Sequence, residues 1–373
     1  MERLEGPLAD FHAIIPAGGV GSRLWPLSRA EAPKFLHDLT GSGHTLLRDT
    51  WQRLLPLCGE DGITVVTGRA HRGAVEKQLP ELRAQNIILE TEPKDSSAAI
   101  GLAAAILHRR NPDVVIGSFA ADHVISDAPR FRAAVAEAVA VARAGYITTI
   151  GITPTEPSVG FGYIRCGADL DVDGAPHAEL VERFVEKPDL DTATAYVASG
   201  DYLWNAGMFI ARADRLLAQL AETHPELHDG LLQMAEAWDT PKRDRVVDAI
   251  WPMLTKIAID YSVAEPAAAA GRLAVVRGDF PWDDVGDFSS LAKLLSGGRT
   301  GDLAILGEGA RVLADSSSGV VVSQSQRLIS LIGVTDIVVV DTPDALLVTT
   351  REHAQRVKSV VDAIKLSGRN DLL

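Results

Sequence analysis

The residues with the clearest chemical potential stand in a glycine-rich loop near the start of the chain. An apolar run at residues 13–15 ends in Pro16 and a glycine cluster, which is typical of a buried strand leading to a loop at a sheet edge. The glycines are Gly18, Gly19 and Gly21. Because they lack Cβ atoms, the loop's backbone N–H groups can form a concave anion site. The cations that follow are Arg23, Arg29 and Lys34, against one acid, Glu31. The loop therefore predicts a ligand with several negative charges, phosphates first.

Two better-known phosphate loops do not fit this stretch. The dinucleotide fingerprint needs a third glycine where Leu24 stands. The Walker A loop needs Gly-Lys-Ser/Thr, whereas Lys34 follows Pro33. Taken alone, the glycines fit a plain turn with solvated arginines about as well as they fit a phosphate site.

The longer string from residue 18 to 27, followed by Pro33-Lys34, resembles the signature of sugar-1-phosphate nucleotidylyltransferases. The stretch Trp25-Pro-Leu-Ser-Arg29 is most similar to the mannose-1-phosphate guanylyltransferase branch. The resemblance implies that the glycines, Ser22 and Arg23 bind the nucleotide phosphates. It also implies that Arg23 and Lys34 are the catalytic residues that steady the transferring phosphate.

The composition limits the classes of protein to which the chain can belong. The chain has 373 residues, of which 46% are hydrophobic and 23% charged, as expected for a soluble globular protein of one or two domains. The two cysteines, Cys58 and Cys166, are too few for a disulfide framework and suit a reducing cytosol. A net charge of −14 argues against nonspecific binding to nucleic acid or anionic membranes. Neither a signal peptide nor an apolar run of the ~20 residues that span a bilayer is recognisable, so we expect a cytoplasmic enzyme.

Strand and helix patterns alternate over the first ~150 residues, which predicts an α/β fold with a Rossmann-like, doubly wound, mostly parallel sheet. Strands are predicted at 63–67, 87–90, 114–119, 146–150 and 181–188. Helices are predicted at 46–57, 70–83, 96–110 (with Ser96 as N-cap) and 129–143, and a helical excursion at 225–251. Such sheets bind ligands at the carboxyl ends of their strands, where the glycine loop would lie.

The last ~75 residues differ in character. From Asp302 on, short β-rich pieces alternate with Gly and Ser turns, and a helix is predicted from about Glu352 to Lys365. We therefore divide the chain into a catalytic domain, 1–298, and a small β domain, 299–373. The resemblance implies a short left-handed β-helix, whose edge strands suit a homodimer. We predict no chemistry in it. Bifunctional relatives continue into a phosphomannose isomerase domain, so that second activity is not expected.

Two distant aspartates are candidate metal ligands. Asp122 follows the strand that ends near Phe119, where it could bind Mg²⁺ or cap a turn. Its segment, Ala121-Asp-His123, resembles the family's Pro-Ala-Asp-His, and His123 could contact a ligand or cap a turn. Residues 280–288 resemble the family's Trp-x-Asp-x-Gly segment, which implies Asp284 rather than Asp283 as the second ligand of a Mg²⁺ cofactor.

A second group of motifs points to a sugar phosphate. Strand alternation predicts that Glu186 and Lys187 point to opposite faces, although a solvated pair is the usual reading of an isolated Glu-Lys. Phe-Val-Glu-Lys-Pro matches the family motif, which implies Glu186 for the sugar hydroxyls and Lys187 for the sugar phosphate. Asn205 matches a second sugar motif, and its amide can both donate and accept. The resemblance adds Gly160, Tyr163 and Asp260 to the sugar-phosphate site, although a β-turn explains Gly160 and a capping role explains Asp260 equally well.

One segment departs from the family pattern. The family's Glu-Pro-x-Gly-Arg-Asn-Thr-Ala-Pro is replaced here by residues 92–99, Glu-Pro-Lys-Asp-Ser-Ser-Ala-Ala. Glu92, Ser96 and Ser97 could substitute for the missing groups, or the segment is an ordinary helix start. Because this region is expected to face the base and sugar, base identity stays open.

The resemblance implies transfer of GMP from GTP to α-D-mannose 1-phosphate, with GTP and mannose 1-phosphate as the partners. The alternatives are the same reaction with another sugar phosphate or nucleoside triphosphate, and a regulatory subunit that binds a nucleotide sugar without catalysis. Arg23, Lys34, Asp122 and Asp284 are all present, which disfavours the regulatory subunit.

Overall fold

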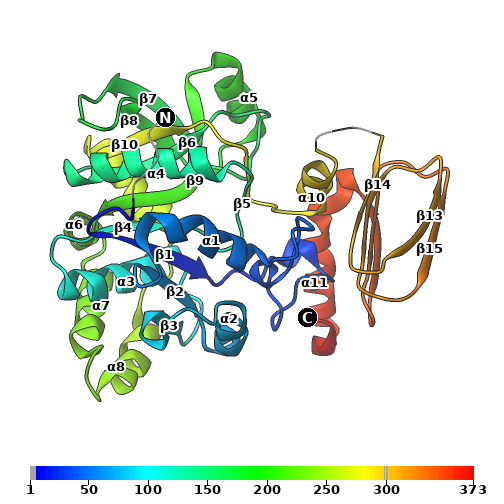
Figure 1. Cartoon of the computed structure of the whole chain (residues 1–373), viewed down its shortest axis with the longest axis horizontal. Coiled ribbons are helices and arrows are strands. Elements are labelled where there is room, and N and C mark those ends of the chain that lie inside the picture. The colour runs from blue at the N-terminus through cyan, green and yellow to red at the C-terminus, as the bar shows by residue number, and fades with distance from the viewer. Residues whose placement is uncertain (1–5, 298, 300) are drawn as a thin grey trace. The chain divides into compact units, whose positions relative to one another are not determined.

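The computed structural model describes residues 6–297, 299 and 301–373 (Figure 1). The chain forms two compact units, each built from separate stretches of sequence. The first unit contains the chain up to Ala17 together with Thr50–Ala121 and Ile125–Trp282. The second unit contains Gly18–Asp49, Asp122–Val124 and Asp283–Leu373. The division into domains at residue 298, made from the sequence, stays a prediction, because these units follow contacts rather than chain order.

The first unit is built on a nine-stranded sheet in the order β3-β2-β1-β4-β9-β6-β10-β8-β7. The strands are β1 (Phe11–Ala17), β2 (Ile63–Gly68), β3 (Ile87–Glu90), β4 (Val115–Ser118), β6 (Ile147–Ile152), β7 (Tyr163–Asp169), β8 (Ala178–Val185), β9 (Tyr202–Arg212) and β10 (Leu273–Gly278). β3, β2, β1 and β4 are parallel, as are β6 and β10, whereas β9 runs antiparallel to β4 and β6. The predicted α/β class is confirmed, with antiparallel pairing in the half of the sheet that contains β7, β8 and β9.

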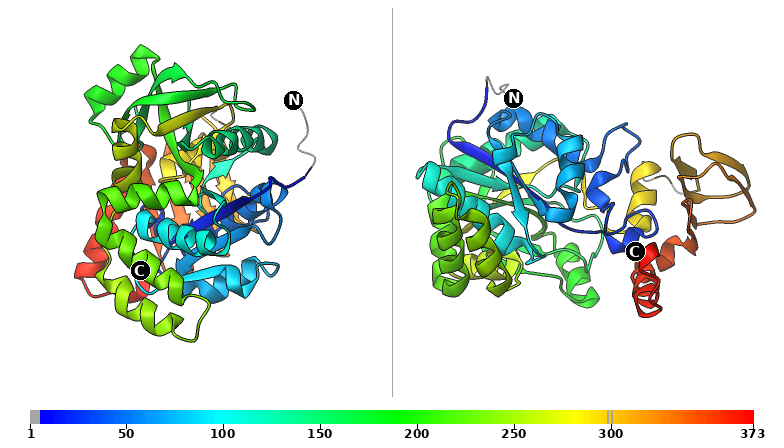
Figure 2. Two further views of the ribbon diagram at one scale, coloured as in Figure 1. Left: turned by 90° about the vertical axis from the view of Figure 1, so that its left-hand side faces the viewer. Right: turned by 90° about the horizontal axis from the view of Figure 1, so that it is seen from below.

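Helices cover this sheet, as the ribbon views show (Figures 1 and 2). They are α2 (Arg72–Gln78), α3 (Ser96–Arg110), α4 (Ala128–Arg143), α5 (Leu190–Ser199), α6 (Ala213–Thr223), α7 (Pro225–Ala237), α8 (Arg243–Ile250) and α9 (Glu265–Ala269). α3 packs on β1 and β2 and against α6 and α7, whereas α4 packs on β6, β9 and β10. The alanine-rich sequence of α3 explains why nearly its whole circumference is buried, because small side chains admit neighbours on every side.

Two local predictions in this unit are wrong, each for a physical reason. The helix predicted at 70–83 is a 3₁₀ turn, Arg69–His71, followed by α2, which stops at Gln78. Pro80 accounts for the early end, since the residue before a proline is disfavoured in the helical region. The cap of α3 is Asp95, whose carboxylate accepts the Ser96 N–H at 2.9 Å, so Ser96 is the first helical residue rather than the cap.

The second unit joins the glycine loop to the C-terminal part of the chain. Its strands form a four-stranded sheet, β12-β14-β16-β17, and a two-stranded one, β13-β15. The bounds are β12 (Leu303–Leu306), β13 (Arg311–Asp315), β14 (Gly319–Ser323), β15 (Leu328–Ile332), β16 (Ile337–Asp341) and β17 (Leu346–Thr350). β12, β14 and β16 are parallel, as are β13 and β15, which is the ladder pattern of a short β-helix.

The helices of this unit pack the β-helix against the loop. They are the 3₁₀ turns η1 (Ser22–Leu24) and η2 (Lys34–Leu36), α10 (Phe288–Leu295), the 3₁₀ helix η7 (Arg351–Arg356) and α11 (Val357–Leu366). One buried cluster contains Leu24, Trp25 and Leu27 of the loop together with Val320 and Val338 of the strands and Val357 and Val361 of the C-terminal helix. The loop and the β-helix therefore share one hydrophobic core.

Three elements span or adjoin the points in the sequence where the chain changes from one unit to the other. They are α1 (Leu46–Cys58), β5 (Val124–Ile125) and β11 (Trp282–Asp283).

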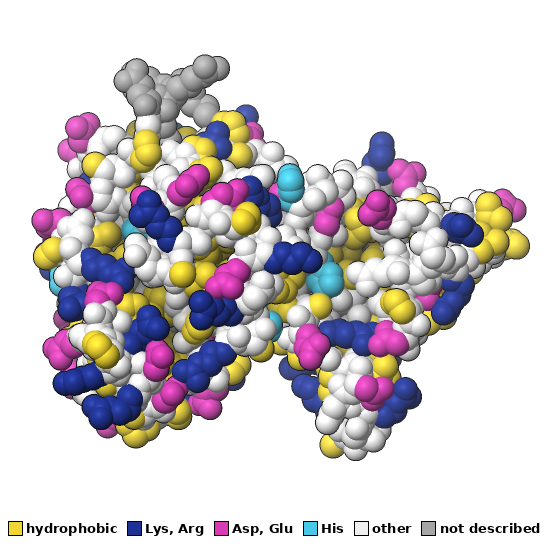
Figure 3. Space-filling model, turned by 60° about the horizontal axis from the view of Figure 1, so that its bottom comes forward, with side chains coloured by type: hydrophobic (Ala, Val, Ile, Leu, Met, Phe, Trp, Pro, Cys, Tyr) yellow, Lys and Arg dark blue, Asp and Glu magenta, His cyan; other side chains and the backbone are white. Residues whose placement is uncertain are grey.

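Among the described residues, no helix combines the length and the apolar character that crossing a bilayer requires. On the face drawn in Figure 3, acidic and basic side chains are intermixed rather than gathered into a field of one sign.

Candidate functional site

The glycine loop is shaped around Lys34. After β1 the chain turns through Gly21, which has a φ of +74°, a conformation open to glycine at little cost. A Cβ at this position would lie 2.7 Å from the Cβ of Lys34, so any side chain there would clash with it. The Lys34 N–H donates to the Val20 carbonyl at 3.1 Å, which closes the loop on the lysine. Gly21 is therefore required both for its backbone conformation and for the space it leaves.

Lys34 contacts both segments of the second unit that carry the predicted metal ligands. Its ammonium, with the residue only 5% exposed, lies 2.8 Å from an oxygen of Asp122 and also donates to the main-chain carbonyl of Asp284. Burial raises the pKa of Asp122, but the Lys34 ammonium and His123 lower it further, so the pKa lies below its usual range. Asp122 is therefore an ionised carboxylate at neutral pH.

Asp283 ends β11, and Asp284 follows it in the next turn. The Asp284 carboxylate accepts the Gly286 N–H at 3.1 Å, and Asp283 accepts the Val285 N–H at 2.6 Å. Burial, together with the charge of Asp284, raises the pKa of Asp283 to about 6. Val285 has a φ of +44°, a strained conformation for a β-branched residue. The strain fixes the direction of a turn that presents both carboxylates.

The donor set at Lys34 suits a hard divalent cation. Mg²⁺ is usually bound by one or two carboxylates together with substrate phosphates and water, and Asp122 and Asp284 provide two. Among the residues that the structure describes, no three His, Cys, Asp or Glu side chains are grouped as metal ligands. The arrangement therefore fits a metal bound jointly with phosphate better than one enclosed by protein.

The two arginines of the loop differ in their partners. Arg29 forms a bidentate ion pair with Asp344, with both N–O distances at 2.6 Å, and also donates to the Pro26 carbonyl. Arg23 donates instead to the neutral amide oxygen of Gln355 at 3.0 Å. The charge of Arg29 is thus paired within the protein, whereas no carboxylate pairs with Arg23 among the residues that the structure describes.

The predicted sugar residues gather in the first unit. β8 ends at Val185, and Lys187 has a φ of +47°, so strand alternation no longer applies to the pair. The Lys187 ammonium lies 2.5 Å from a Glu186 carboxylate oxygen. The prediction that the two side chains point to opposite faces is therefore wrong. Their exposure still differs: the Glu186 side chain is 7% exposed and that of Lys187 58%.

Asn205, on β9, is hydrogen-bonded to Asp260. The Thr149 hydroxyl donates to the Asn205 amide oxygen at 2.8 Å, and the Asn205 amide nitrogen donates to Asp260 at 2.9 Å. Burial and the nearby charge of Glu186 raise the pKa of Asp260 to about 6. Glu186–Lys187 and Asn205–Asp260 are thus two bonded pairs, close enough for the charges of the first pair to act on Asp260.

Gly160 and Tyr163 lie on the turn that leads into β7. Tyr163 is fully buried and its hydroxyl donates to the Ser158 carbonyl at 2.9 Å, so it braces the turn. Gly160 donates its N–H to the Ser158 hydroxyl at 3.2 Å and has no positive φ. Contact of either residue with a sugar stays a prediction. Gly162 is the more constrained glycine, because a Cβ there would lie 2.5 Å from a Glu186 oxygen.

The segment that departs from the family pattern anchors the turn carrying Asp260. The Ser96 hydroxyl accepts the Ile259 N–H at 2.8 Å, and the Ser97 hydroxyl lies 2.7 Å from that of Ser262. Asp260 begins a π-helix, Asp260–Ala264, between these two contacts. Sequence reasoning missed this role, as it missed Thr149 and Gln355, since no local pattern marks contacts between residues so far apart in the chain.

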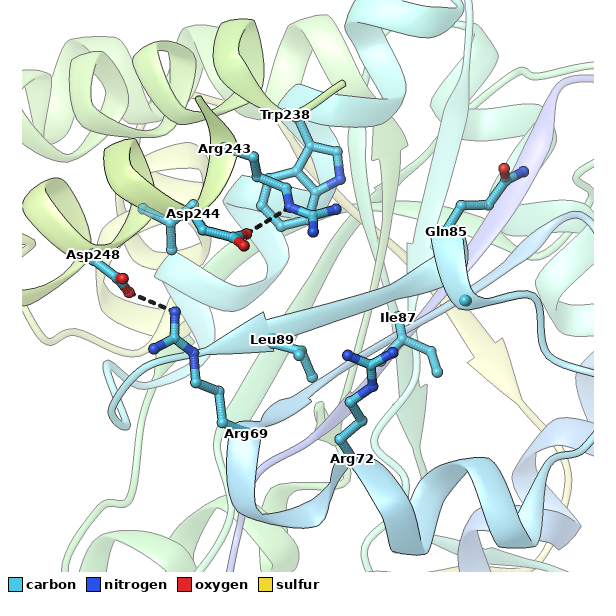
Figure 4. A pocket seen from close by; sticks show the side chains of 11 residues that line it. Arg69, Arg72, Gln85, Ile87, Leu89, Trp238, Arg243, Asp244 and Asp248 are labelled. Atoms are coloured by element: carbon cyan, nitrogen blue, oxygen red, sulfur yellow. Dashed lines mark hydrogen bonds and ion pairs between the residues drawn. The ribbon is translucent and has the colours of Figure 1, made fainter. Parts of the chain in front are cut away.

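A cavity of about 740 Å³ in the first unit contains none of the predicted site residues (Figure 4). Its lining includes the apolar side chains of Ile87, Leu89 and Trp238. It also includes three arginines, Arg69, Arg72 and Arg243. Each of these arginines is paired with an acid, namely Asp248, Glu76 and Asp244 respectively. The pocket therefore has no uncompensated arginine charge to attract a phosphate.

Family models match most of the chain. Residues 12–297 match the model described as nucleotidyl transferase, and residues 309–364 match a MannoseP isomerase/GMP-like beta-helix domain. The second match agrees with the parallel ladders of the second unit.

Individual relatives match over nearly the same span. The xanthan biosynthesis protein XanB of Xanthomonas campestris is 39% identical over 370 residues, which cover 98% of this chain and 75% of that protein. A mannose-1-phosphate guanylyltransferase of Escherichia coli is 39% identical over 97% of this chain and 75% of its own length. A crystal structure from Thermus thermophilus, described as a mannose-1-phosphate geranyltransferase, has a TM-score of 0.84 at 30% identity and covers 95% of this chain and 99% of that one. This chain therefore belongs to the nucleotidyl transferase family and is a nucleotidyltransferase enzyme.

Proposed function

We propose that this enzyme transfers the GMP group of GTP to the phosphate of α-D-mannose 1-phosphate, giving GDP-mannose and pyrophosphate. Relatives named mannose-1-phosphate guanylyltransferase, at 36–39% identity over 96–97% of the chain, support this choice of substrates. The observation in the chain itself that carries the proposal is the buried Lys34 ammonium, which contacts the Asp122 carboxylate and the main-chain carbonyl of Asp284. A cation for phosphate beside two acids that could bind a metal suits nucleotidyl transfer.

In the proposed reaction a phosphate oxygen of the sugar phosphate attacks the α-phosphorus of GTP. A new P–O bond forms as the bond to the β-phosphate oxygen breaks, and pyrophosphate leaves in line with the attack. The attacking phosphate is already an anion, so no serine, cysteine or histidine nucleophile is required. The protein then contributes positioning and charge stabilisation.

We assign the nucleotide phosphates to the second unit. The N–H groups of the glycine loop and Ser22 bind them, and Arg23 neutralises the departing pyrophosphate. Lys34 steadies the α-phosphate or the attacking phosphate. Asp122 and Asp284 would hold Mg²⁺, which, when bound, supplies positive charge to the phosphate oxygens.

We assign the sugar phosphate to the first unit. Glu186, nearly buried and carrying an acceptor-only carboxylate when ionised, accepts from sugar hydroxyls. Lys187, whose side chain is 58% exposed, is free to move from Glu186 to the sugar phosphate. Asn205 and Asp260 complete the hydroxyl-binding group, and Gly160 and Tyr163 shape the turn beside it.

We also propose a cytoplasmic homodimer formed through the β-helix. Leu313 of β13 and Leu328 and Ile332 of β15 are 62%, 56% and 77% exposed, on two paired strands. Such an apolar face suits a second copy of the chain. Replacing Leu313 and Ile332 by Ser should convert a dimer to monomer in light scattering. A wild-type chain that is already monomeric would overturn this assignment.

The substrate assignment is tested by measuring pyrophosphate release with four nucleoside triphosphates against a panel of sugar 1-phosphates. We expect the highest kcat/KM for GTP with mannose 1-phosphate. A clear preference for another pair would correct the substrates and leave nucleotidyl transfer in place. Absence of pyrophosphate with every pair would support a regulatory subunit instead.

A further inference from the structure

The C-terminal segment contributes one polar side chain to the phosphate loop. Gln355, on η7, accepts a hydrogen bond at 3.0 Å from a guanidinium nitrogen of Arg23 on η1. Among the described residues, this amide oxygen is the one hydrogen-bond partner of the Arg23 guanidinium. The two residues are 332 positions apart, so only the fold of the second unit brings them together.

The orientation of the Gln355 amide is fixed by Asp287. The amide nitrogen donates to one oxygen of Asp287, which is 4% exposed. The other Asp287 oxygen caps α10 by accepting the N–H groups of Ser289 and Ser290 at 2.7 and 3.0 Å. An ionised carboxylate only accepts, so it must face the amide nitrogen of Gln355 and leave the amide oxygen for Arg23. The donor role of the Gln355 amide nitrogen and the acceptor role of its oxygen therefore follow from the acceptor-only carboxylate.

The backbone around Gln355 is held by the core that also holds the loop. Ala354 and Val357, on either side of it in the sequence, are buried in the cluster that contains Leu24 and Trp25. The Trp25 indole N–H donates to the Leu372 carbonyl at 2.7 Å. The backbone at Gln355 is therefore held rigidly, and its amide can keep the flexible Arg23 side chain in one conformation.

We propose that Gln355 is a positioning residue that holds Arg23 in the conformation that binds the nucleotide phosphates; this rests on the function proposed above. A neutral amide suits the task, since it takes one of the five guanidinium donors and leaves the charge uncompensated. Arg29 shows the contrast, because its carboxylate partner Asp344 uses both charge and donors. The β-helix domain, in which we predicted no chemistry, thereby supports the phosphate loop directly.

The test is a double-mutant cycle between Arg23→Ala and Gln355→Ala in the full-length protein. Gln355→Ala should lower kcat/KM for GTP about 10-fold, the size of one lost hydrogen bond to a charged group, and raise KM for pyrophosphate in the reverse reaction. KM for mannose 1-phosphate should change by less than about 2-fold. In the Arg23→Ala background, Gln355→Ala should have no further effect, because its target is gone.

A matched control separates positioning from loss of stability. Val361→Ala removes buried methyl groups from α11 in the same cluster and leaves the Arg23–Gln355 contact untouched. If Val361→Ala shows the same kinetic defect at equal loss of thermal stability, or if Arg23→Ala and Gln355→Ala act additively, the positioning role is overturned. Gln355→Glu should also lower kcat/KM, since it places an acid at Arg23 and a second carboxylate beside Asp287.

The cycle can also be measured on equilibrium binding of GTP. A wild-type chain that binds GTP but makes no GDP-mannose would overturn the proposed function, while the cycle on affinity still decides the role of Gln355. A wild-type chain that releases pyrophosphate with unchanged kinetics in Gln355→Ala would overturn the positioning role alone. A wild-type chain that binds no GTP would overturn both.

Discussion

At the scale of residues, the cations of the phosphate loop are separated by what they touch. Lys34 meets two acids that are candidate metal ligands, Arg29 is neutralised by Asp344, and Arg23 meets an amide. Their spacing along the chain gave no reason to distinguish these three cations. Their different partners distinguish the three cations, and binding of phosphate by Arg23 and Lys34 stays a prediction.

The choice of Asp284 over Asp283 as a metal ligand leads to a direct comparison of isosteric variants. Asp284→Asn and Asp122→Asn should each lower kcat about 10²- to 10³-fold, because each removes a charge that balances metal and phosphate. Asp283→Asn should stay within about 5-fold, since an amide oxygen can still accept the Val285 N–H. Titrating Mg²⁺ against activity should show weaker metal binding in the first two variants only. The opposite ranking of Asp283 and Asp284 would refute the assignment.

Asp260 provides a prediction on stability and pH. The pKa of its carboxyl rises from the ordinary 3.8 in the unfolded chain to about 6 in the folded one, so the folded state binds more protons between these pH values. Its contribution to stability therefore declines as pH rises from about 4 to 6, and at pH 7 its charge costs on the order of 1–3 kcal/mol.

Asp260→Asn should accordingly raise the free energy of unfolding at pH 7 and have little effect at pH 4. Denaturant unfolding at the two pH values measures this difference. Thr223→Val serves as a control on a neighbouring polar contact, since the Thr223 hydroxyl donates to the Ser262 carbonyl and carries no charge. Equal effects of Asp260→Asn at both pH values would contradict the raised pKa.

At the scale of elements, the glycine loop depends on the packing of Gly21 against η2. Gly21 and Gly41 share a φ of +74°, but a Cβ at Gly41 would meet nothing within 4 Å. The pair therefore separates backbone strain from a steric clash with Lys34.

Gly41→Ala should cost about 1 kcal/mol of stability from strain and leave activity within about 2-fold. Gly21→Ala should cost about 3 kcal/mol and lower kcat/KM at least about 100-fold, because Lys34 must move away from Asp122 and Asp284. Thermal unfolding and steady-state kinetics on both variants measure these effects. Equal behaviour of the two variants would show that space for Lys34 is not the reason for the glycine.

The strands and long helices were predictable because their causes are local. The apolar run of β2, the alanine-rich α3 and the alternating end of β8 each carry their period in the sequence. The predictions were wrong where a single residue interrupts a regular pattern. Pro80 ends the helical pattern of α2, and the positive φ of Lys187 ends the strand alternation at the Glu186-Lys187 pair.

Sequence motifs identified the site residues, but they did not identify the residues that hold those side chains in position. Asn205 and Asp260 were identified by resemblance, but Thr149 and Ser96, which fix them, belong to no motif. Gln355 lies 332 positions from Arg23 and was assigned to a region without chemistry. Contacts of this kind depend on the completed fold, so spacing along the chain does not predict them.

At the scale of the whole molecule, the C-terminal part completes the core of the second unit. Although the nucleotidyl transferase model matches residues 12–297, Leu24, Trp25 and Leu27 are buried against the strands and helix that follow. Deleting residues 299–373 should therefore abolish activity and expose these side chains to solvent. Dye binding to exposed apolar surface and pyrophosphate release on the shortened chain measure the outcome. A shortened chain with wild-type kcat/KM would show that the loop folds without the β-helix.

In the proposed reaction, the α-phosphorus of GTP is transferred to a sugar phosphate under the control of Lys34 and the two aspartates. The most direct measurement follows α- and γ-labelled GTP in separate reactions with mannose 1-phosphate. We predict that the α label appears in GDP-mannose and the γ label in pyrophosphate, in equal amounts, and that Lys34→Met abolishes both. Appearance of the γ label in inorganic phosphate or on the sugar would contradict the account, because it would place the bond cleavage at the γ-phosphorus.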